Sequence, residues 1–258
     1  MIVRPLKEQV QVVQQTDHDD LSGEFAAALD GHLWQLRARS SVVRACAEHD
    51  EGWRIWERDP DLDPATGGAC DFLDVDVRRH LEFYRAGIQE AVDNDPYAGL
   101  LVSLHGTGIY RGRHGLDPGL GFRRLDGGDA APIGSFIAEQ EALQSRLAAE
   151  LAVDPLEVWG AYRLLEVADR FSLYFCRPRS GGAVALGPLA GRAGEDVAIR
   201  LEPRGDWTVT LRPNPFGREV ALNLRRRLLP DRRWSSPAEF QRALRATPAE
   251  TVTVTVTA

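Results

Sequence analysis

The segment PLEVWGAYRLLEVADRFSLYFC, residues 155–176, predicts one long α-helix. Trp159, Tyr162, Glu166, Asp169 and Leu173 recur three to four residues apart and therefore lie on one stripe of that helix. The stripe mixes apolar side chains with two carboxyl groups. A carboxylate on an inward face is costly to bury unless an opposite charge or a cation accompanies it. The segment therefore predicts a packed core with a charged site beside it.

Helical patterning extends from about residue 17 to about residue 178, with apolar side chains at helical spacing in several segments. Residues 106–134 are rich in Gly, Arg and Asp, and we expect a long loop there. Residues 1–15 carry two short apolar runs around a polar break, which is typical of a β-hairpin. The middle of the chain is therefore expected to be helical and its start extended.

The pattern changes after residue 180. Four segments alternate apolar and polar residues or read as extended runs, namely 197–201, 207–211, 220–224 and 251–256. They predict a small antiparallel sheet. The expected fold is mostly α, with a helical domain over residues 16–179 and a small antiparallel β appendage formed by residues 180–258 together with the N-terminal hairpin, residues 1–15.

Composition narrows the class of protein. The chain has 258 residues, a net charge of −7 and a pI near 5.4, which argues against a nucleic-acid partner that needs a basic surface. It begins without the pattern of a signal peptide and has no apolar run long enough to cross a bilayer. Cys46, Cys70 and Cys176 are far apart and predict neither a disulfide framework nor a zinc knuckle. We expect a cytoplasmic protein without a membrane partner.

Histidine and aspartate residues recur on the inward faces of the expected helices. His49 and Asp50 are adjacent, and His49 follows Cys46 by three positions. A lone inward histidine is usually a hydrogen-bonded core residue, but several such residues on different helices favour convergence on metal ions. The candidate ligands are His18, His49, Asp50, His80, His105 and Asp169. This set suits two divalent or mixed-valence ions bridged by Asp50, with Fe or Mn favoured and Zn, Ni or Co allowed.

The order of these residues resembles the HD-domain superfamily over roughly residues 17–176. His49-Asp50-x-Gly52 is similar to its His-Asp-x-Gly motif, and His80 and His105 match the extra histidines of its binuclear members. These members include cyclic-dinucleotide phosphodiesterases and di-iron oxygenases similar to myo-inositol oxygenase. The resemblance implies a helical HD-type domain with a binuclear centre. The chain departs from the pattern at Trp53, where many members have a lysine, and it lacks the Gly-Tyr-Pro string.

The whole chain also resembles an uncharacterised bacterial family of unknown function. Three segments carry this resemblance, namely 49–53 (HDEGW), 103–108 (SLHGTG) and 169–173 (DRFSL). The resemblance implies relatives without implying a reaction.

Three functions remain open at this point. The first is hydrolysis of a phosphate ester or anhydride, with His49 and Asp50 as catalytic residues of the metal centre. The second is a di-iron oxygenase acting on a small polyol or phosphonate, and the third is a non-catalytic ligand-binding module. The expected partner is a small anionic molecule, and the oligomeric state stays open. The residues expected to contact the substrate are Glu51, Thr107, Tyr110, Arg111 and Glu166.

Overall fold

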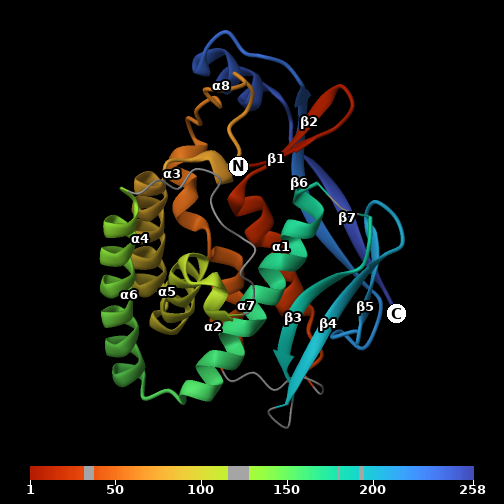
Figure 1. Ribbon diagram of the computed structural model, residues 1–258. Coiled ribbons are helices and arrows are strands. Elements are labelled where there is room, and N and C mark those ends of the chain that lie inside the picture. The colour runs from red at the N-terminus through yellow and green to blue at the C-terminus, as the bar shows by residue number, and fades with distance from the viewer. Residues whose placement is uncertain (32–37, 116–127, 179–180, 192–194) are drawn as a thin grey trace.

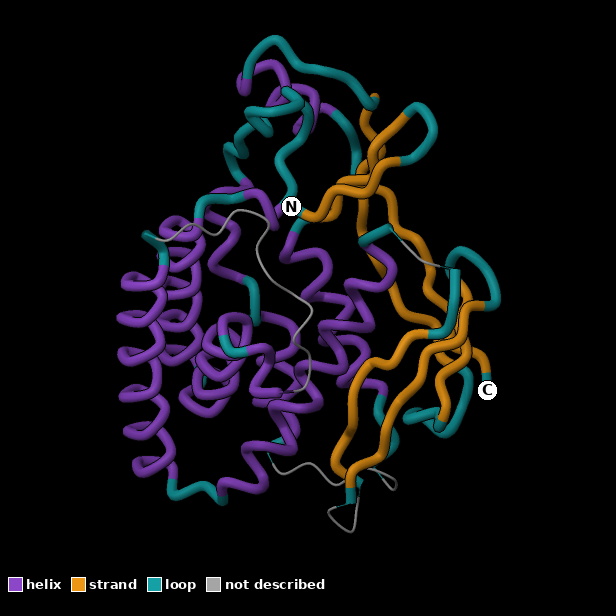
Figure 2. Tube along the Cα trace, viewed as in Figure 1, coloured by secondary structure: helices purple, strands orange, loops and turns teal. Residues whose placement is uncertain are grey.

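A layer of helices packs against a curled sheet (Figure 1). The computed structural model describes residues 1–31, 38–115, 128–178, 181–191 and 195–258. Helices account for 53% and strands for 21% of these residues, so the sheet is a major part of the fold. Figure 2 shows the helices gathered on one side of the molecule and the strands on the other.

The helices begin where the sequence supplies caps. Asp76, Asp95, Asp154 and Ser236 accept backbone N–H groups in the first turns of α4, α5, α7 and α8, which satisfies donors that the helix itself leaves unpaired. The helices are α1 (Gln15–Ala28), α2 (Arg39–Glu48), α3 (Arg54–Glu57), α4 (Val77–Asn94), α5 (Pro96–Tyr110), α6 (Ala130–Leu151), α7 (Pro155–Cys176) and α8 (Pro237–Ala246). The 3₁₀ turns are η1 (Glu51–Trp53), η2 (Phe72–Asp74) and η3 (Gly112–Gly115).

Seven strands form one sheet in the order β1-β2-β6-β7-β5-β4-β3. They are β1 (Ile2–Pro5), β2 (Gln9–Val13), β3 (Val184–Ala190), β4 (Asp196–Pro203), β5 (Thr208–Arg212), β6 (Val220–Pro230) and β7 (Glu250–Thr257). Strands β5 and β7 pair in parallel, with Thr208 opposite Thr255, and the other neighbours pair antiparallel. The N-terminal hairpin joins the sheet through β2, where Gln9 lies opposite Pro230.

The expected mostly-α fold with a small antiparallel β appendage is wrong. The sheet has seven strands. It is mixed because β7 lies between β6 and β5 and pairs antiparallel with β6 and parallel with β5. Its strict alternation buries Val254 and Val256 on the inner face, as a central strand requires. Alternation identifies an extended segment and its buried face, but it does not specify which strands become neighbours.

One hydrophobic cluster joins the helices to the sheet. Phe25 of α1 and Phe171 of α7 have ring centroids 4.8 Å apart, and the same cluster contains Leu222 of β6 and Val254 of β7. The division of the chain into two separate units stays a prediction, with a helical unit over residues 16–179 and a β-rich unit formed by residues 1–15 and 180–258. Among the described residues, no helix is long and apolar enough to span a membrane.

The segment expected as a loop, residues 106–134, is shorter than predicted. Helix α5 continues to Tyr110, and α6 begins at Ala130. Residues 116–127 of this segment lie outside the described part of the chain.

The turn after the His49-Asp50 pair packs backbone to backbone against α4. A Cβ atom at Gly52 would overlap the carbonyl oxygen of Phe83, and one at Gly87 would lie 2.8 Å from the nitrogen of Gly52. Only glycine allows two backbone segments to approach this closely. Gly52 therefore fixes the distance between the His49-Asp50 segment and the helix that carries His80.

We expect Gly52→Ala to lower the free energy of unfolding by about 1–3 kcal/mol, because the added methyl group overpacks a backbone contact. Chemical denaturation followed by circular dichroism measures the change. Gly134→Ala is the matched control, because its Cβ would meet nothing within 4 Å on α6. That variant should gain about 0.5–1 kcal/mol from the helix preference of alanine. Equal stability of the two variants would contradict the proposed constraint.

Candidate metal centre

Five elements bring histidine and carboxyl side chains together in the interior. Helix α1 supplies His18 and Asp19, the end of α2 supplies His49 and the following Asp50, and α4 and α5 supply one histidine each. Helix α7 supplies Glu166 and Asp169. Every one of these side chains is less than one-tenth exposed, namely His18, Asp19, His49, Asp50, His80, His105, Glu166 and Asp169. Such burial of charged and polar groups requires partners or cations.

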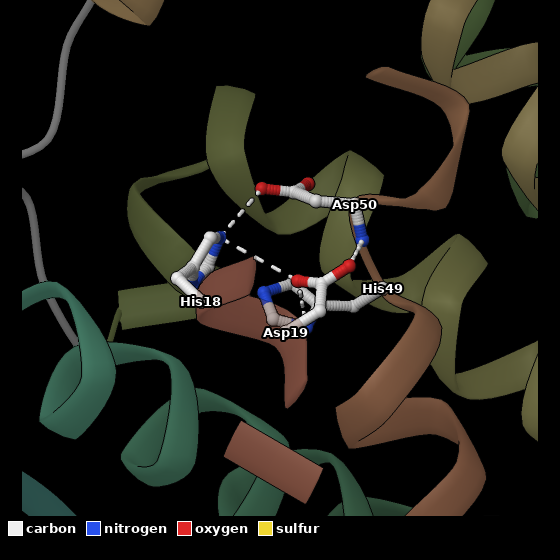
Figure 3. Close-up of side chains that lie close together, drawn as sticks. All are labelled: His18, Asp19, His49 and Asp50. Carbon is white, nitrogen blue, oxygen red and sulfur yellow. Dashed lines mark hydrogen bonds and ion pairs between the residues drawn. The ribbon is translucent and has the colours of Figure 1, made fainter. Parts of the chain in front are cut away.

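The first cluster contains His18, Asp19, His49 and Asp50 (Figure 3). His18 Nε2 lies 3.2 Å from Asp50 Oδ2, and His49 Nδ1 lies 3.1 Å from Asp19 Oδ1. The backbone N–H of Asp50 donates to Asp19 Oδ2 at 2.9 Å. One ligand atom from each of the four residues lies within 4.8 Å of the others. These four groups could therefore surround one ion.

The second cluster contains His49, His105 and Asp169, whose ligand atoms also lie within 4.8 Å of one another. The rings of His49 and His105 have centroids 4.8 Å apart, and His49 Nε2 lies 3.6 Å from Asp169 Oδ1. Because His49 belongs to both clusters, the two form one continuous site.

His80 lies outside both clusters but lines the same cavity. The cavity has a volume of about 40 Å³, and its polar walls are Asp50, His80, Tyr84, His105, Arg113 and Asp169, with Gln15 at its margin. His80 Nδ1 lies 2.5 Å from the hydroxyl of Tyr110. The rest of the wall is apolar and consists of Trp53, Phe72, Leu73, Ile109 and Leu173. All six residues predicted as ligands thus belong to the clusters or to this cavity.

Hydrogen bonds orient three of the histidines. His49 Nδ1 lies 3.0 Å from the carbonyl oxygen of Cys46, and His105 Nδ1 lies 2.9 Å from Glu166 Oε1. Both oxygens can only accept, so both Nδ1 atoms donate.

His18 Nδ1 lies 2.8 Å from Ser172 Oγ, which itself donates to the carbonyl oxygen of Asp169 at 2.8 Å. The serine proton is thus already used, and His18 Nδ1 donates as well. In the neutral form of each of these three rings, the lone pair is on Nε2.

Positive neighbours keep three of the four carboxyl groups ionised. Burial raises the pKa of Asp169 and Glu166, but Arg113 outweighs it and, together with the nearby histidines, lowers both values. Burial opposes ionisation of Asp50 too, yet the hydrogen bond to His18 and the charge on His49 lower its pKa. Burial first, and then the charge of Asp50, raise the pKa of Asp19 well above its usual range. The site thus holds more negative charge than its own residues neutralise.

The pKa values of His49 and His80 shift in opposite directions, because carboxylates dominate at His49 and burial dominates at His80. Burial lowers the pKa of His49, but the carboxylates of Asp19, Asp169 and Asp50 outweigh it and raise the value to about 10. Burial lowers the pKa of His80 to about 3, so this ring is neutral at pH 7. A neutral imidazole is the form that binds a metal ion.

Four residues of the site were not among the predicted ligands or contacts. Asp19 follows His18 directly, and its place in an acidic run was its only signal in the sequence. Ser172 lies three positions after Asp169 on the inward side of α7. Tyr84 donates a hydrogen bond to Asp50 Oδ1, and Arg113 forms ion pairs with Glu166 and Asp169. Tyr84 had one signal in the sequence, its position four residues after His80 on the same helix face. Arg113 had no such signal.

The five predicted substrate contacts divide into two groups. Tyr110 touches His80, and Glu166 touches His105, so both belong to the site. Thr107 donates within α5 to the carbonyl oxygen of Ser103 or Leu104. Arg111 pairs with Glu141 at 2.7 Å on the surface, and Glu51 pairs with Arg54. Glu51, Thr107 and Arg111 do not line the cavity.

The donor set fits a metal ion. Imidazole nitrogens and carboxylate oxygens are ligands for Fe, Mn, Zn, Ni and Co, whereas an all-oxygen site would favour Mg or Ca. His49 Nε2 is buried and has no hydrogen-bond partner among the described residues, although Asp169 Oδ1 lies 3.6 Å away. A buried polar atom without a partner is costly. A cation between these ligands would remove that cost and neutralise the carboxylates.

Comparisons with known proteins give a family. No curated protein and no solved structure matches this chain. The sequence profile described as "Protein of unknown function (DUF3891)" matches residues 1–231. Because this match covers most of the 258 residues, the chain belongs to the DUF3891 family of proteins of unknown function.

Proposed function

We propose that this protein is a metal-dependent hydrolase that cleaves a phosphate ester or anhydride at a binuclear centre of the HD type. The ligands would be His18, His49, Asp50, His80, His105 and Asp169. The orientation of the histidines carries the proposal. In His18, His49 and His105, Nδ1 donates to an oxygen of the protein, which leaves Nε2 as the ligand atom. Histidines that bind metals are held in this way by a second hydrogen bond.

The two oxygens of Asp50 support a bridging role. Oδ2 lies toward His18, and Oδ1 accepts a hydrogen bond from Tyr84 on the side of the cavity that His80 lines. The carboxylate therefore lies between the two halves of the site. Tyr84 orients Asp50, Tyr110 orients His80, and Glu166 orients His105. Two bound ions would supply an acidified water and neutralise the charge that develops on a phosphoryl group.

An apolar cavity wall favours a second candidate, a di-iron oxygenase that uses the same ligands on a small polyol or phosphonate. Trp53, Leu73 and Ile109 line the cavity that His80 and Tyr84 also line, and their apolar surface disfavours water there. Exclusion of water protects reactive intermediates from side reactions, which oxygen chemistry requires more than hydrolysis does.

The metal content of purified protein tests the centre itself. Protein prepared without chelators should contain up to two ions per chain by elemental analysis, and His49→Ala or Asp50→Ala should lose most of them. His114→Ala is the matched control, because His114 lies near α5 but belongs to neither ligand cluster. Unchanged metal content in both ligand variants would rule out the centre.

Metal affinity should rise with pH. Because the pKa of His49 is raised to about 10, this ring carries a proton at neutral pH, and a metal ion must displace it. From this proton alone the affinity should change about tenfold per pH unit below that value, or roughly 100-fold between pH 6.5 and 8.5. Competition between the protein and a chelator of known pH dependence for Mn²⁺ measures it. An affinity independent of pH over this range would show that His49 is not a ligand.

Two assays separate the two reactions. A hydrolase should release phosphate from small phosphate esters under anaerobic conditions with Mn²⁺, and Asp50→Asn should reduce the rate by at least about 100-fold because the ions lose their shared ligand. The oxygenase would instead require iron and consume oxygen. Oxygen uptake coupled to substrate loss, without anaerobic phosphate release, would replace the hydrolase proposal with the second candidate.

A further inference from the structure

A strained turn places an arginine in the wall of the cavity. In η3, Gly112, Arg113 and His114 all have positive φ values, of 55°, 50° and 52°. Left-handed backbone is unfavourable for residues with a Cβ atom and persists only where the surroundings hold it. Here it carries the Arg113 side chain inward, so that this residue is only 4% exposed. The strained turn therefore serves to place a guanidinium group beside the predicted ligands.

Two carboxylates hold that guanidinium group by its outer nitrogens. Nη1 donates to Glu166 Oε2, and Nη2 lies 2.8 Å from Asp169 Oδ2. Nε is buried and makes no hydrogen bond with the described residues. A buried donor without a partner is costly. Arg113 is thus anchored at one end and keeps one N–H group for a ligand.

The cavity next to Arg113 is small. Asp50, His80 and His105 line it together with Arg113, and its volume is about 40 Å³. This space suits one small group, because about 10–15 Å³ of such space is enough to hold a water molecule. A terminal group of a substrate can enter it, while the rest of the molecule must remain outside.

The net charge of the site determines which chemical group of a substrate can bind in the cavity. With Asp19 protonated and the histidines neutral, Asp50, Glu166 and Asp169 against Arg113 leave a formal charge of about −2, and two divalent ions would bring it to about +2. Without Arg113 the loaded site would carry about one positive charge less. A guanidinium N–H group beside metal ions is a favourable partner for a phosphoryl oxygen.

We propose that Arg113 is a substrate-binding residue, whose Nε–H group binds an oxygen of a terminal phosphoryl group in the cavity. It therefore restricts the substrates to small molecules that end in a phosphate or phosphonate. This inference rests on the metal centre proposed above. Glu166 and Asp169 position the guanidinium group, and the strained turn keeps it there when the cavity is empty. Arg111, which the sequence favoured for this role, lies on the surface with Glu141.

Binding of inorganic phosphate to the Mn²⁺-loaded protein tests the role of Arg113. Equilibrium dialysis should show one phosphate per chain in the wild type, at least tenfold weaker binding in Arg113→Gln, and an intermediate affinity in Arg113→Lys, which keeps the charge without the fork. Metal content, measured on the same samples, should stay at the wild-type level in both variants. Arg111→Gln is the matched control from the same segment and should bind phosphate as the wild type does.

Four results would overturn the inference, and they are distinguishable. Undiminished phosphate binding in Arg113→Gln with full metal content, or no phosphate binding by the metal-loaded wild type, would remove Arg113 from substrate binding and leave the metal centre intact. Loss of metal from both Arg113 variants would assign Arg113 to the support of Asp169 alone. A wild type without metal would overturn the centre and, with it, this inference. Circular dichroism of both Arg113→Gln and Arg113→Lys tests whether the variants are folded.

Discussion

The need to bury four carboxyl groups beside four histidines is the constraint on which the rest of this structure depends. Asp19, Asp50, Glu166 and Asp169 lie within one interior region, and Arg113 is the guanidinium group that pairs with two of them. Ionised groups in an interior of low polarity repel one another strongly unless opposite charges lie between them. Hydrogen bonds fix these side chains, and the cations proposed above would supply the positive charge that the cluster lacks.

Helix α7 connects this site to the rest of the fold. Its inward face carries Glu166, Asp169 and Ser172, and other positions along it, such as Val167 and Phe171, belong to the hydrophobic cluster shared with the sheet. Helix α1 does the same with His18 on one side and Phe25 on another. His18, Asp19, Glu166 and Asp169 therefore sit on two helices that the sheet supports from behind. Support of this kind favours precise ligand geometry.

The sequence predicts the helical elements and the burial of the candidate ligands better than it predicts the sheet. Helical spacing places His80, His105 and Asp169 on inward faces, because that spacing is a local property of each helix. The pairing of β7 with β5 depends instead on the return of the chain after α8, which no local pattern encodes. Arg113 escapes detection for a related reason: its place in the cavity depends on three left-handed residues in a glycine-rich segment, where periodicity is lost.

Strand β2 pairs with β6, so Gln9 lies opposite Pro230 across more than two hundred positions of sequence. A contact between such distant segments forms slowly, because the chain between them loses conformational entropy before the two strands gain their hydrogen bonds. During synthesis on the ribosome, β2 emerges early and waits for its partner. All six proposed metal ligands are made before β3 and β6, the strands against which α7 and α1 pack. If the proposed centre binds metal, its uptake would therefore follow the assembly of the sheet, late in folding.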